Sequence, residues 1–343
     1  MAVVKNILVT GGAGYIGSHT VVELINNGYT PVILDDYRNS NPRVISGIES
    51  ITQSKVVSRD VDVCDFNKLN EIFKEFRFEG VIHFAAYKAV GESVLEPLKY
   101  YRNNLLGLIN CLDLAVIHQV KNFVFSSSCT IYGEPEGIKV VTEASKIQPA
   151  NSPYGNTKQI GEEIINDLVK SGAEIKILNL RYFNPVGAHS TGLIGELPIG
   201  KPNNLFPFIT QTAIGKLEKL TVYGNDYSTL DGTCVRDYVH VCDVADAHVK
   251  GMKWLQDQTN CLVENVNIGT GKGSSVLEII HIFEKISGTT LNWQMGERRE
   301  GDIEEIYADV KKSQSLLNWK SKKSVEDAVK DAWNWELKLN DVK

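Results

Sequence analysis

The chain has 343 residues, of which 43% are hydrophobic and 23% charged, and its formal net charge is −6. This length exceeds what one hydrophobic core usually supports, so we expect two lobes or an elaborated domain. The acidic balance lacks the basic excess of nucleic-acid-binding proteins, and no apolar run reaches the roughly 18 residues of a membrane span. Because the N-terminus also lacks a cleavable signal pattern, we expect a cytoplasmic protein that binds neither nucleic acid nor membranes.

Short β-branched runs alternate with amphipathic stretches through the first half of the chain. Strands are expected at 7–9, 32–34, 56–57, 81–84, 123–125 and 175–180, and helices at 16–27, 69–76, 97–118 and from Tyr154 onward. Apolar strands separated by helices indicate a parallel sheet that is covered on both faces. The sequence therefore predicts an α/β fold with a doubly wound parallel sheet of the Rossmann type.

After about Arg181 the sequence becomes rich in Gly, Pro and Asn, which is typical of a lobe that covers a ligand. Further helices are expected at 208–219, 276–286 and 325–337, and a strand followed by a helix at 239–254. We predict a nucleotide-binding Rossmann domain over 1–183, to which 236–255 returns. A smaller α/β substrate-binding lobe is predicted over 184–235 and 256–343.

A glycine-rich turn follows the first strand and opens the first helix, with glycines at Gly11, Gly14 and Gly17. Glycines allow backbone N–H groups to approach a pyrophosphate, which the positive end of the helix then stabilises. Asp35 ends the second strand, where a carboxylate accepts from the adenosine ribose hydroxyls and repels a 2′-phosphate. NAD is therefore favoured over NADP, although Arg38 lies near enough in sequence to pair with a 2′-phosphate.

Tyr154 and Lys158 are four residues apart, so on a helix both side chains project from one face. Alone, such a pair is usually an ordinary solvated face, but Ser128 also ends a buried strand at the edge where ligands bind in this architecture. A neighbouring ammonium favours phenolate, so we expect a lowered tyrosine pKa. Together the three residues predict redox chemistry on a hydroxyl: Tyr154 takes the proton, Lys158 holds the phenolate and the nicotinamide ribose, and Ser128 orients the substrate oxygen.

Several longer motifs occur in a fixed order along the chain: TGGAGYIGSHT, HFAAYKAVGES, FSSSCTIYG, SPYGNTK, LRYFNPVGAH, PNNL, DGTCVRDYVHV and RREGD. With them the chain resembles the extended short-chain dehydrogenases/reductases, and more closely the UDP-glucose 4-epimerase (UDP-galactose 4-epimerase) family, from Asn6 to Trp335. The resemblance implies oxidation of C4 of UDP-glucose or UDP-galactose by tightly held NAD, followed by reduction of the 4-keto sugar on its opposite face. It also implies a homodimer through helices 97–118 and 152–170.

The resemblance implies cofactor contacts along the glycine turn and at the ends of the strands. These residues are Gly11, Gly14, Tyr15, Ile16, Gly17, Asp35, Asp36, Tyr37, Asn39, Ser40, Asp62, Val63, Phe84, Ala85, Ala86, Lys88, Asn103, Ser128, Tyr154, Lys158 and Phe183. Contacts with the UDP-sugar are implied at Lys88, Ser128, Tyr154, Phe183, Asn184, Asn204, Leu205, Thr221, Tyr223, Arg236, Arg299, Asp302 and Ile306. Arginine suits a diphosphate because it forms charge-assisted hydrogen bonds, and an aspartate can accept from uridine ribose hydroxyls.

Four positions depart from the family pattern or vary within it. Ala86-Tyr87 stands where relatives carry Gly-Leu, which adds bulk near the cofactor, and Cys129 replaces a more usual alanine and is expected to pack rather than react. Ile306 is neither a bulky aromatic nor a small residue at the position that bears on an N-acetyl group at sugar C2. We therefore expect a strong preference for UDP-glucose and UDP-galactose, with weak use of UDP-GlcNAc and UDP-GalNAc.

Other functions remain open at this point. A nucleotide-sugar 4,6-dehydratase has the same fold but carries Asp-Glu after the fifth strand, where this chain has Thr130-Ile131-Tyr132 and so lacks the acid. A UDP-glucuronate decarboxylase is a second alternative. A non-catalytic NAD-sensing protein is a third, although it has no need of Ser128, Tyr154 and Lys158 together. The scattered cysteines and histidines show no metal-ligand spacing, so no metal is expected.

Overall fold

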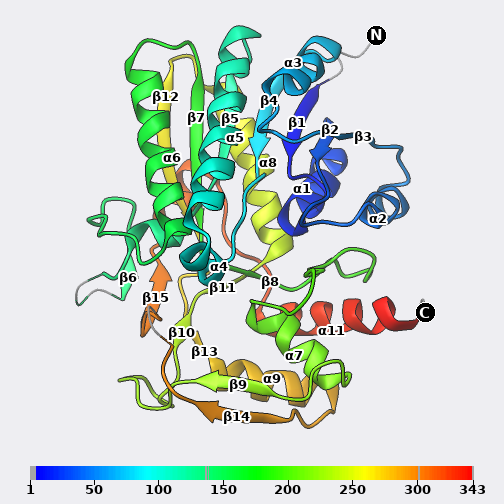
Figure 1. The fold of residues 1–343 in the computed structure, drawn as a ribbon, viewed down its shortest axis with the longest axis vertical. Helices are drawn as coiled ribbons and strands as arrows, with labels where there is room; N and C mark the ends of the chain where they lie inside the picture. The colour runs from blue at the N-terminus through cyan, green and yellow to red at the C-terminus, as the bar shows by residue number, and fades with distance from the viewer. Residues whose placement is uncertain (1–4, 136, 138, 300–301, 342–343) are drawn as a thin grey trace.

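The computed structural model describes residues 5–135, 137, 139–299 and 302–341. Its larger part is built around a seven-stranded sheet (Figure 1). Its strand order is β12-β7-β5-β4-β1-β2-β3, and all pairings are parallel. The strands are β1 (Asn6–Thr10), β2 (Thr30–Asp35), β3 (Val57–Asp60), β4 (Phe78–His83), β5 (Asn122–Ser128), β7 (Lys176–Tyr182) and β12 (Leu262–Ile268). The predicted doubly wound fold is confirmed.

Helices cover both faces of this sheet. One face carries α1 (Tyr15–Asn26), α2 (Arg43–Thr52) and α8 (Val241–Asp257), and the other carries α3 (Phe66–Glu75), α5 (Pro97–Ile117) and α6 (Pro153–Lys170). Within β1, Ile7 and Val9 join the first core while Leu8 joins the second. Because side chains alternate along a strand, a continuous apolar run supplies both cores at once.

The start of α6 fixes where its catalytic candidates lie. The Ser152 hydroxyl accepts a hydrogen bond from the backbone N–H of Gly155 at 3.1 Å, and Pro153 occupies the first helical position. Serine caps free N–H groups, and proline is suited to this position because it has none to leave unpaired. Tyr154 and Lys158 therefore lie in the first turns of the helix, directly beside the end of β5.

The smaller lobe forms the lower part of Figure 1. It consists of α7 (Leu205–Ala213), α9 (Val276–Ser287), α11 (Val325–Asp341) and a ribbon in which β9 (Leu220–Tyr223) pairs with β14 (Trp293–Gly296). Its core contains Phe206, Ile280 and Phe283. The helix predicted at 208–219 is displaced and stops at Ala213, because Gly215 turns the chain with a φ of +78°.

Short elements connect the two parts. β11 (Tyr238–His240) pairs with β8 (Asn184–Val186), and a four-stranded sheet has the order β13-β10-β15-β6. Its strands are β13 (Ser274–Ser275), β10 (Val235–Arg236), β15 (Glu305–Ala308) and β6 (Val140–Val141). The remaining elements are α4 (Val90–Leu95), the 3-10 helix η1 (Cys129–Tyr132) and α10 (Lys311–Leu317). None of the described helices combines the length and hydropathy needed to cross a bilayer.

The predicted lobe boundary is wrong at β12. Residues 256–343 were predicted to lie in the smaller lobe, but β12 pairs with β7 along its whole length and forms the edge of the large sheet. Trp319, from the same predicted region, is buried in the first core, and its indole N–H donates to the Asp243 carbonyl of α8 at 3.0 Å. β12 was missed because it is an edge strand, half-buried in its first four residues, and its polar Glu264 and Asn265 interrupt the apolar run typical of central strands.

Candidate active site

The order of the large sheet reverses between β1 and β4, and ligands of such folds bind beyond the carboxyl ends of the strands at this point. The glycine turn lies there. Gly11 has a φ of +68°, and a Cβ at this position would lie 2.8 Å from the backbone N of Ala85. A Cβ on Gly17 would lie 2.2 Å from the Gly11 carbonyl oxygen. Neither position tolerates a side chain, so the turn packs closely against the segment after β4, and the N-terminus of α1 lies at this end of the sheet.

Asp35 connects the glycine turn to the loop after β2. Its buried carboxylate accepts from the backbone N–H groups of Ala13 and Tyr37, both at 3.0 Å, and from the Ser40 hydroxyl at 2.7 Å. Burial raises the pKa of Asp35, and these donors oppose the rise. Tyr37 adopts the left-handed backbone conformation, with a φ of +58°, and its hydroxyl lies 2.6 Å from that of Ser58. The loop is therefore held in one shape around the carboxylate.

Arg38 does not offer a free guanidinium to a 2′-phosphate. It forms ion pairs with Asp36 and, at 2.7 Å, with Asp62, two residues that were expected to line the cofactor. This arrangement favours NAD over NADP. The other expected cofactor residues lie at the same end of the sheet: Tyr15 and Ile16 at the start of α1, Asn39 beyond β2, Val63 beyond β3, Phe84, Ala85, Ala86 and Lys88 beyond β4, and Asn103 on α5.

The three catalytic candidates converge at the junction of β5 and α6. Ser128 and Lys158 are buried and Tyr154 is half-buried. The Lys158 Nζ donates to the carbonyl of Ser126 at 2.6 Å and lies 5.9 Å from the centroid of the Tyr154 ring. The side chains predicted from spacing alone to act together are thus grouped in space.

The acid–base state of these groups differs from the sequence expectation. Burial raises the pKa of Tyr154 to about 12, opposed by a hydrogen bond with Ser128, and burial lowers the pKa of Lys158 to about 8, opposed by the charge of Glu162. The predicted lowering of the tyrosine pKa is therefore wrong for the protein alone. The cause is that Lys158 points its ammonium at a backbone carbonyl, so removal of the phenol from water is the larger effect.

A buried ion pair that the sequence analysis missed supports this centre. Arg181 in β7 donates to both carboxylate oxygens of Glu162 in α6, at 3.0 and 2.6 Å, and the Ser127 hydroxyl donates to the same carboxylate at 2.6 Å. The two charged side chains are 3% and 5% exposed. Losing either partner leaves an unpaired buried charge, so the pair locks α6 against β5 and β7. An arginine inside the apolar strand run was the available signal.

Part of the expected substrate set lies against the catalytic centre. Phe183 and Asn184 follow β7, and the buried Ile306 packs in one cluster with Phe183 and Tyr132. In the four-stranded sheet, Arg236 of β10 is paired with Ile306 of β15. Burial raises the pKa of the neighbouring Cys129 thiol to about 12, which fits packing rather than nucleophilic chemistry.

The remaining expected substrate residues form two outer groups. In one, Arg299 donates to Asp302 at 2.6 Å and its guanidinium lies 5.6 Å from the centroid of the Tyr223 ring, on the same strand as Thr221. In the other, the Lys88 ammonium and the amide of Asn204 both donate to Glu196, at 3.0 and 2.5 Å. Asn204 precedes Leu205 at the start of α7. Glu196 lies in a loop without a recognisable motif, so sequence reasoning missed it.

One family model and several curated relatives match nearly the whole chain. The family model described as GDP-mannose 4,6 dehydratase matches residues 8–332. UDP-glucose 4-epimerase 2 of Arabidopsis thaliana is 48% identical over 335 residues, covering 96% of this chain and 95% of its own length. UDP-glucose 4-epimerase of Bacillus subtilis is 47% identical over 330 residues, covering 96% of each. The chain belongs to the UDP-glucose 4-epimerase family.

Solved structures of this family share the fold. UDP-glucose-4-epimerase from Stenotrophomonas maltophila with bound NAD and formylated UDP-arabinopyranose has a TM-score of 0.95 and 42% identity, covering 99% of this chain and 100% of that one. The Bifidobacterium longum enzyme with NAD+ and UDP has a TM-score of 0.93 and 42% identity, covering 97% and 98%. The UDP-Glc/GlcNAc 4-epimerase of Campylobacter jejuni has a TM-score of 0.83 and 34% identity, covering 97% and 99%.

The 3-10 helix η1 occupies the place where a dehydratase of the same fold would carry its acid. It begins directly after Ser128, and its residues Ile131 and Tyr132 are fully buried in the cluster that contains Ile306. An elimination of water needs an acid at this place. The segment carries none, and its apolar side chains serve packing, so the epimerase relatives describe the site better.

Proposed function

We propose that this chain interconverts UDP-glucose and UDP-galactose through a 4-keto intermediate, with NAD held throughout the cycle. The observation that carries this function is the meeting of Ser128, Tyr154 and Lys158 at the edge of the sheet that also presents the glycine turn. The site fits NAD, because no Cβ fits at Gly11 and the buried Asp35 carboxylate can still accept from ribose hydroxyls. When bound, NAD supplies the acceptor and donor of the C4 hydride.

The chain's own groups handle the proton and the orientation of the sugar. Tyr154 exchanges the proton of the 4-hydroxyl, and Ser128 orients that oxygen through a hydrogen bond. In the protein alone the phenol is protonated at neutral pH, since its pKa is about 12, so it needs an added positive charge nearby to become a base. Lys158, whose ammonium donates to the Ser126 carbonyl in the protein alone, is assigned to hold the phenolate and the nicotinamide ribose once NAD is bound. The cycle has no net consumption of oxidant, so NAD does not need to be exchanged between turnovers.

The two outer groups, together with Arg236 beside the catalytic centre, are assigned to the UDP moiety. Arg236 and Arg299 are suited to the diphosphate, Asp302 to the uridine ribose, and Lys88 and Asn204 to the phosphate side of the groove. Tyr223, Thr221 and Leu205 then surround the uridine. Ile306 lies beside the sugar and sets the preference for UDP-glucose and UDP-galactose over their N-acetylated counterparts.

We also infer a homodimer formed through α5 and α6, which pack side by side on one face of the sheet (Figure 1). Along α5, Leu98, Leu106, Ile109 and Ile117 are 72%, 40%, 43% and 58% exposed. Apolar side chains at this spacing form a stripe that a second copy of the chain can cover. Sedimentation at micromolar concentration tests this: a dimer is expected, and a monomer contradicts it. A cytoplasmic location and a role in galactose metabolism are part of the same proposal, supported by the activity of the relatives.

One experiment tests the function directly. The purified protein is incubated with UDP-galactose without added NAD, and UDP-glucose is the expected product. Absence of UDP-glucose even with added NAD contradicts the proposal. Release of CO₂ from UDP-glucuronate would identify a decarboxylase, and a 4-keto-6-deoxy product would identify a dehydratase. A Tyr154→Phe variant with undiminished function would indicate an NAD-sensing protein.

A further inference from the structure

Tyr87 lies in the segment after β4, between the expected cofactor residues Ala86 and Lys88. Its backbone N–H donates to Oδ1 of Asn104 at 2.9 Å, and its carbonyl accepts from Nδ2 of the same side chain at 3.0 Å. Asn104 is buried on α5 and also donates to the hydroxyl of Thr157 at 3.1 Å. Because Thr157 directly precedes Lys158, the segment after β4 is fastened to α5 and to the catalytic helix.

The ring of Tyr87 makes a second set of contacts. The Lys99 ammonium lies 4.7 Å from its centroid, the Arg38 guanidinium 5.9 Å, and the Tyr100 ring 5.6 Å. Cations within about 6 Å of an aromatic centroid are attracted by the ring. Arg38 belongs to the loop after β2 and Lys99 to α5, so one side chain connects both to the segment after β4.

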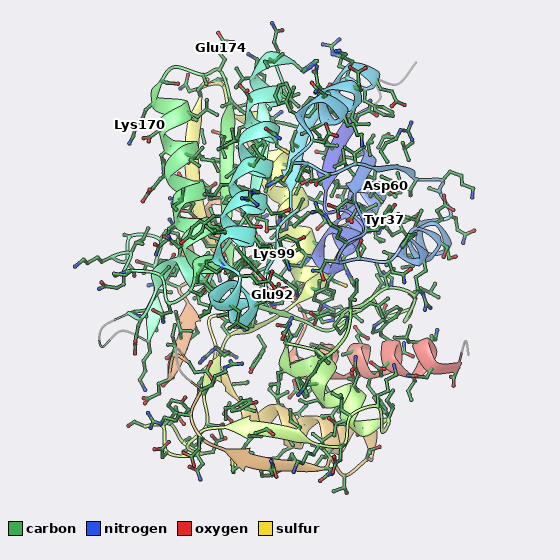
Figure 2. The ribbon with its side chains drawn as sticks, in the orientation of Figure 1. Tyr37, Asp60, Glu92, Lys99, Lys170 and Glu174 are labelled. Carbon is green, nitrogen blue, oxygen red and sulfur yellow. The ribbon has the colours of Figure 1, made fainter. Side chains whose placement is uncertain are left out.

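The two cations are themselves held in place. Arg38 is paired with Asp36 and Asp62, and Lys99 donates to Glu92 at 2.7 Å. Figure 2 shows Lys99 and Glu92 close together where α4 meets α5. A cation that is already fixed loses little freedom on contacting a ring, so the contacts with Tyr87 join parts that are each rigid. A leucine at this position would have no aromatic face to offer.

We propose that Tyr87 is a positioning residue that clasps the loop after β2 to the segment after β4 and thereby slows the release of NAD; this rests on the proposed function. We assign the wall beside the adenosine to Asp35 and its loop, and the opposite wall to the segment from Phe84 to Lys88. A bound dinucleotide leaves when these walls separate. Separation breaks the contact between Arg38 and Tyr87, so the ring adds to the barrier for release without touching the reacting atoms.

The test measures release rather than turnover. Holoprotein loaded with NAD labelled in the adenine ring is mixed with excess unlabelled NAD, and the label retained is counted over time. Tyr87→Leu is expected to release label about tenfold faster, equivalent to about 1.4 kcal/mol. Tyr87→Phe keeps the ring and is expected to stay within about twofold of the wild type, because the cations interact with the ring face. Lys99→Met keeps the ring, removes one cation and is expected to give a smaller acceleration.

Two outcomes overturn the clasp: Tyr87→Leu releasing label at the wild-type rate, or Tyr87→Phe releasing it as fast as Tyr87→Leu. If Tyr87→Leu does not fold, an unchanged rate in Arg38→Met, which removes the cation on the β2 side of the contact, overturns it instead. A parallel assay converts UDP-galactose in saturating NAD. If the wild type converts UDP-galactose but Tyr87→Leu releases NAD at the wild-type rate, only the clasp is contradicted. If Tyr87→Leu releases NAD faster but the wild type does not convert UDP-galactose, only the proposed function is contradicted.

Discussion

The catalytic end of the large sheet and the outer substrate groups are stabilised in different ways. Ser128 and Lys158 are 7% and 4% exposed, and the Lys158 ammonium donates a hydrogen bond to the Ser126 carbonyl. The side chain of Arg299 is 60% exposed, and Tyr223 beside it is 47% exposed. A buried polar group needs a partner within the fold, whereas water satisfies an exposed one. The buried catalytic candidates are therefore held by partners within the fold, whereas the outer groups, which we assign to the substrate, remain accessible to it.

The largest expected effect comes from the buried centre. Tyr154→Phe removes the proton-transferring hydroxyl and leaves the ring, so turnover of UDP-galactose should fall by about 10³-fold, within the range for acid–base groups. NAD retention should persist, because the glycine turn and Asp35 are unchanged. Steady-state kinetics and bound NAD content measure both. Tyr101→Phe, on the neighbouring helix α5, is the matched control and should keep most activity; a Tyr154→Phe variant above one tenth of wild-type turnover contradicts the assignment.

Lys158 provides a second test of how strongly the centre is buried. Its folded pKa of about 8 lies below the unfolded value, so between about pH 8 and 10.4 the unfolded state binds more protons and stability rises with pH. The cost of burying the ammonium is present below this window and gone above it. The measured quantity is the free energy of unfolding of the cofactor-free wild type minus that of Lys158→Met. From about pH 8 to 10.4 this difference should increase by up to about 3 kcal/mol.

Denaturant unfolding at several pH values measures this difference, and subtracting the variant removes the contributions of cysteines and other tyrosines. Lys170→Met is the control, since Lys170 lies at the far end of the same helix with a side chain that is 77% exposed (Figure 2). The pH dependence for Lys158→Met is compared with that for this exposed lysine. A flat difference for Lys158→Met would mean that the buried centre is no less hydrated than the surface.

The contrast between the two regions also explains what the sequence could predict. The central strands were visible because burial on both faces requires a continuous apolar run, and the glycine turn because it tolerates no side chain. The Tyr154 and Lys158 pair was visible because helical spacing places both residues on one face. In each case the requirement is local, and so it leaves a local pattern.

What the sequence could not predict depends on contacts between distant residues. Glu196 contacts Lys88 across 108 positions, and nothing near either residue indicates the pairing. Glu162 and Arg181 are recognisable as partners only once α6 lies against β7. The pKa of Tyr154 was predicted in the wrong direction because spacing reports the neighbouring charge but not the loss of water, which the whole fold determines.

A smaller effect is expected in the exposed region. Arg299→Leu removes a cation assigned to the diphosphate, so the KM for UDP-galactose should rise about tenfold. This corresponds to about 1.4 kcal/mol, close to what a hydrogen bond to a charged group contributes. The stability of the fold should be nearly unchanged. Arg298→Leu is a control one residue away, because Arg298 is paired with Asp226 at 2.6 Å on the surface. It should alter KM by less than about twofold, as surface ion pairs contribute little. Equal effects of both variants would place the diphosphate elsewhere.

The smallest effect concerns sugar selectivity, where the two regions meet. Ile306 is 2% exposed and packs on Phe183 and Tyr132, so Ile306→Ala opens space beside the sugar and should cost about 2 to 4 kcal/mol of stability. The ratio of kcat/KM for UDP-GlcNAc to that for UDP-glucose should rise about fivefold, less than a full methylene-sized pocket change can give. Val141→Ala, a cavity in the same cluster, should reduce stability and leave the ratio unchanged. Comparable wild-type turnover of both sugars would contradict the assigned preference, since Ile306 would then exclude nothing.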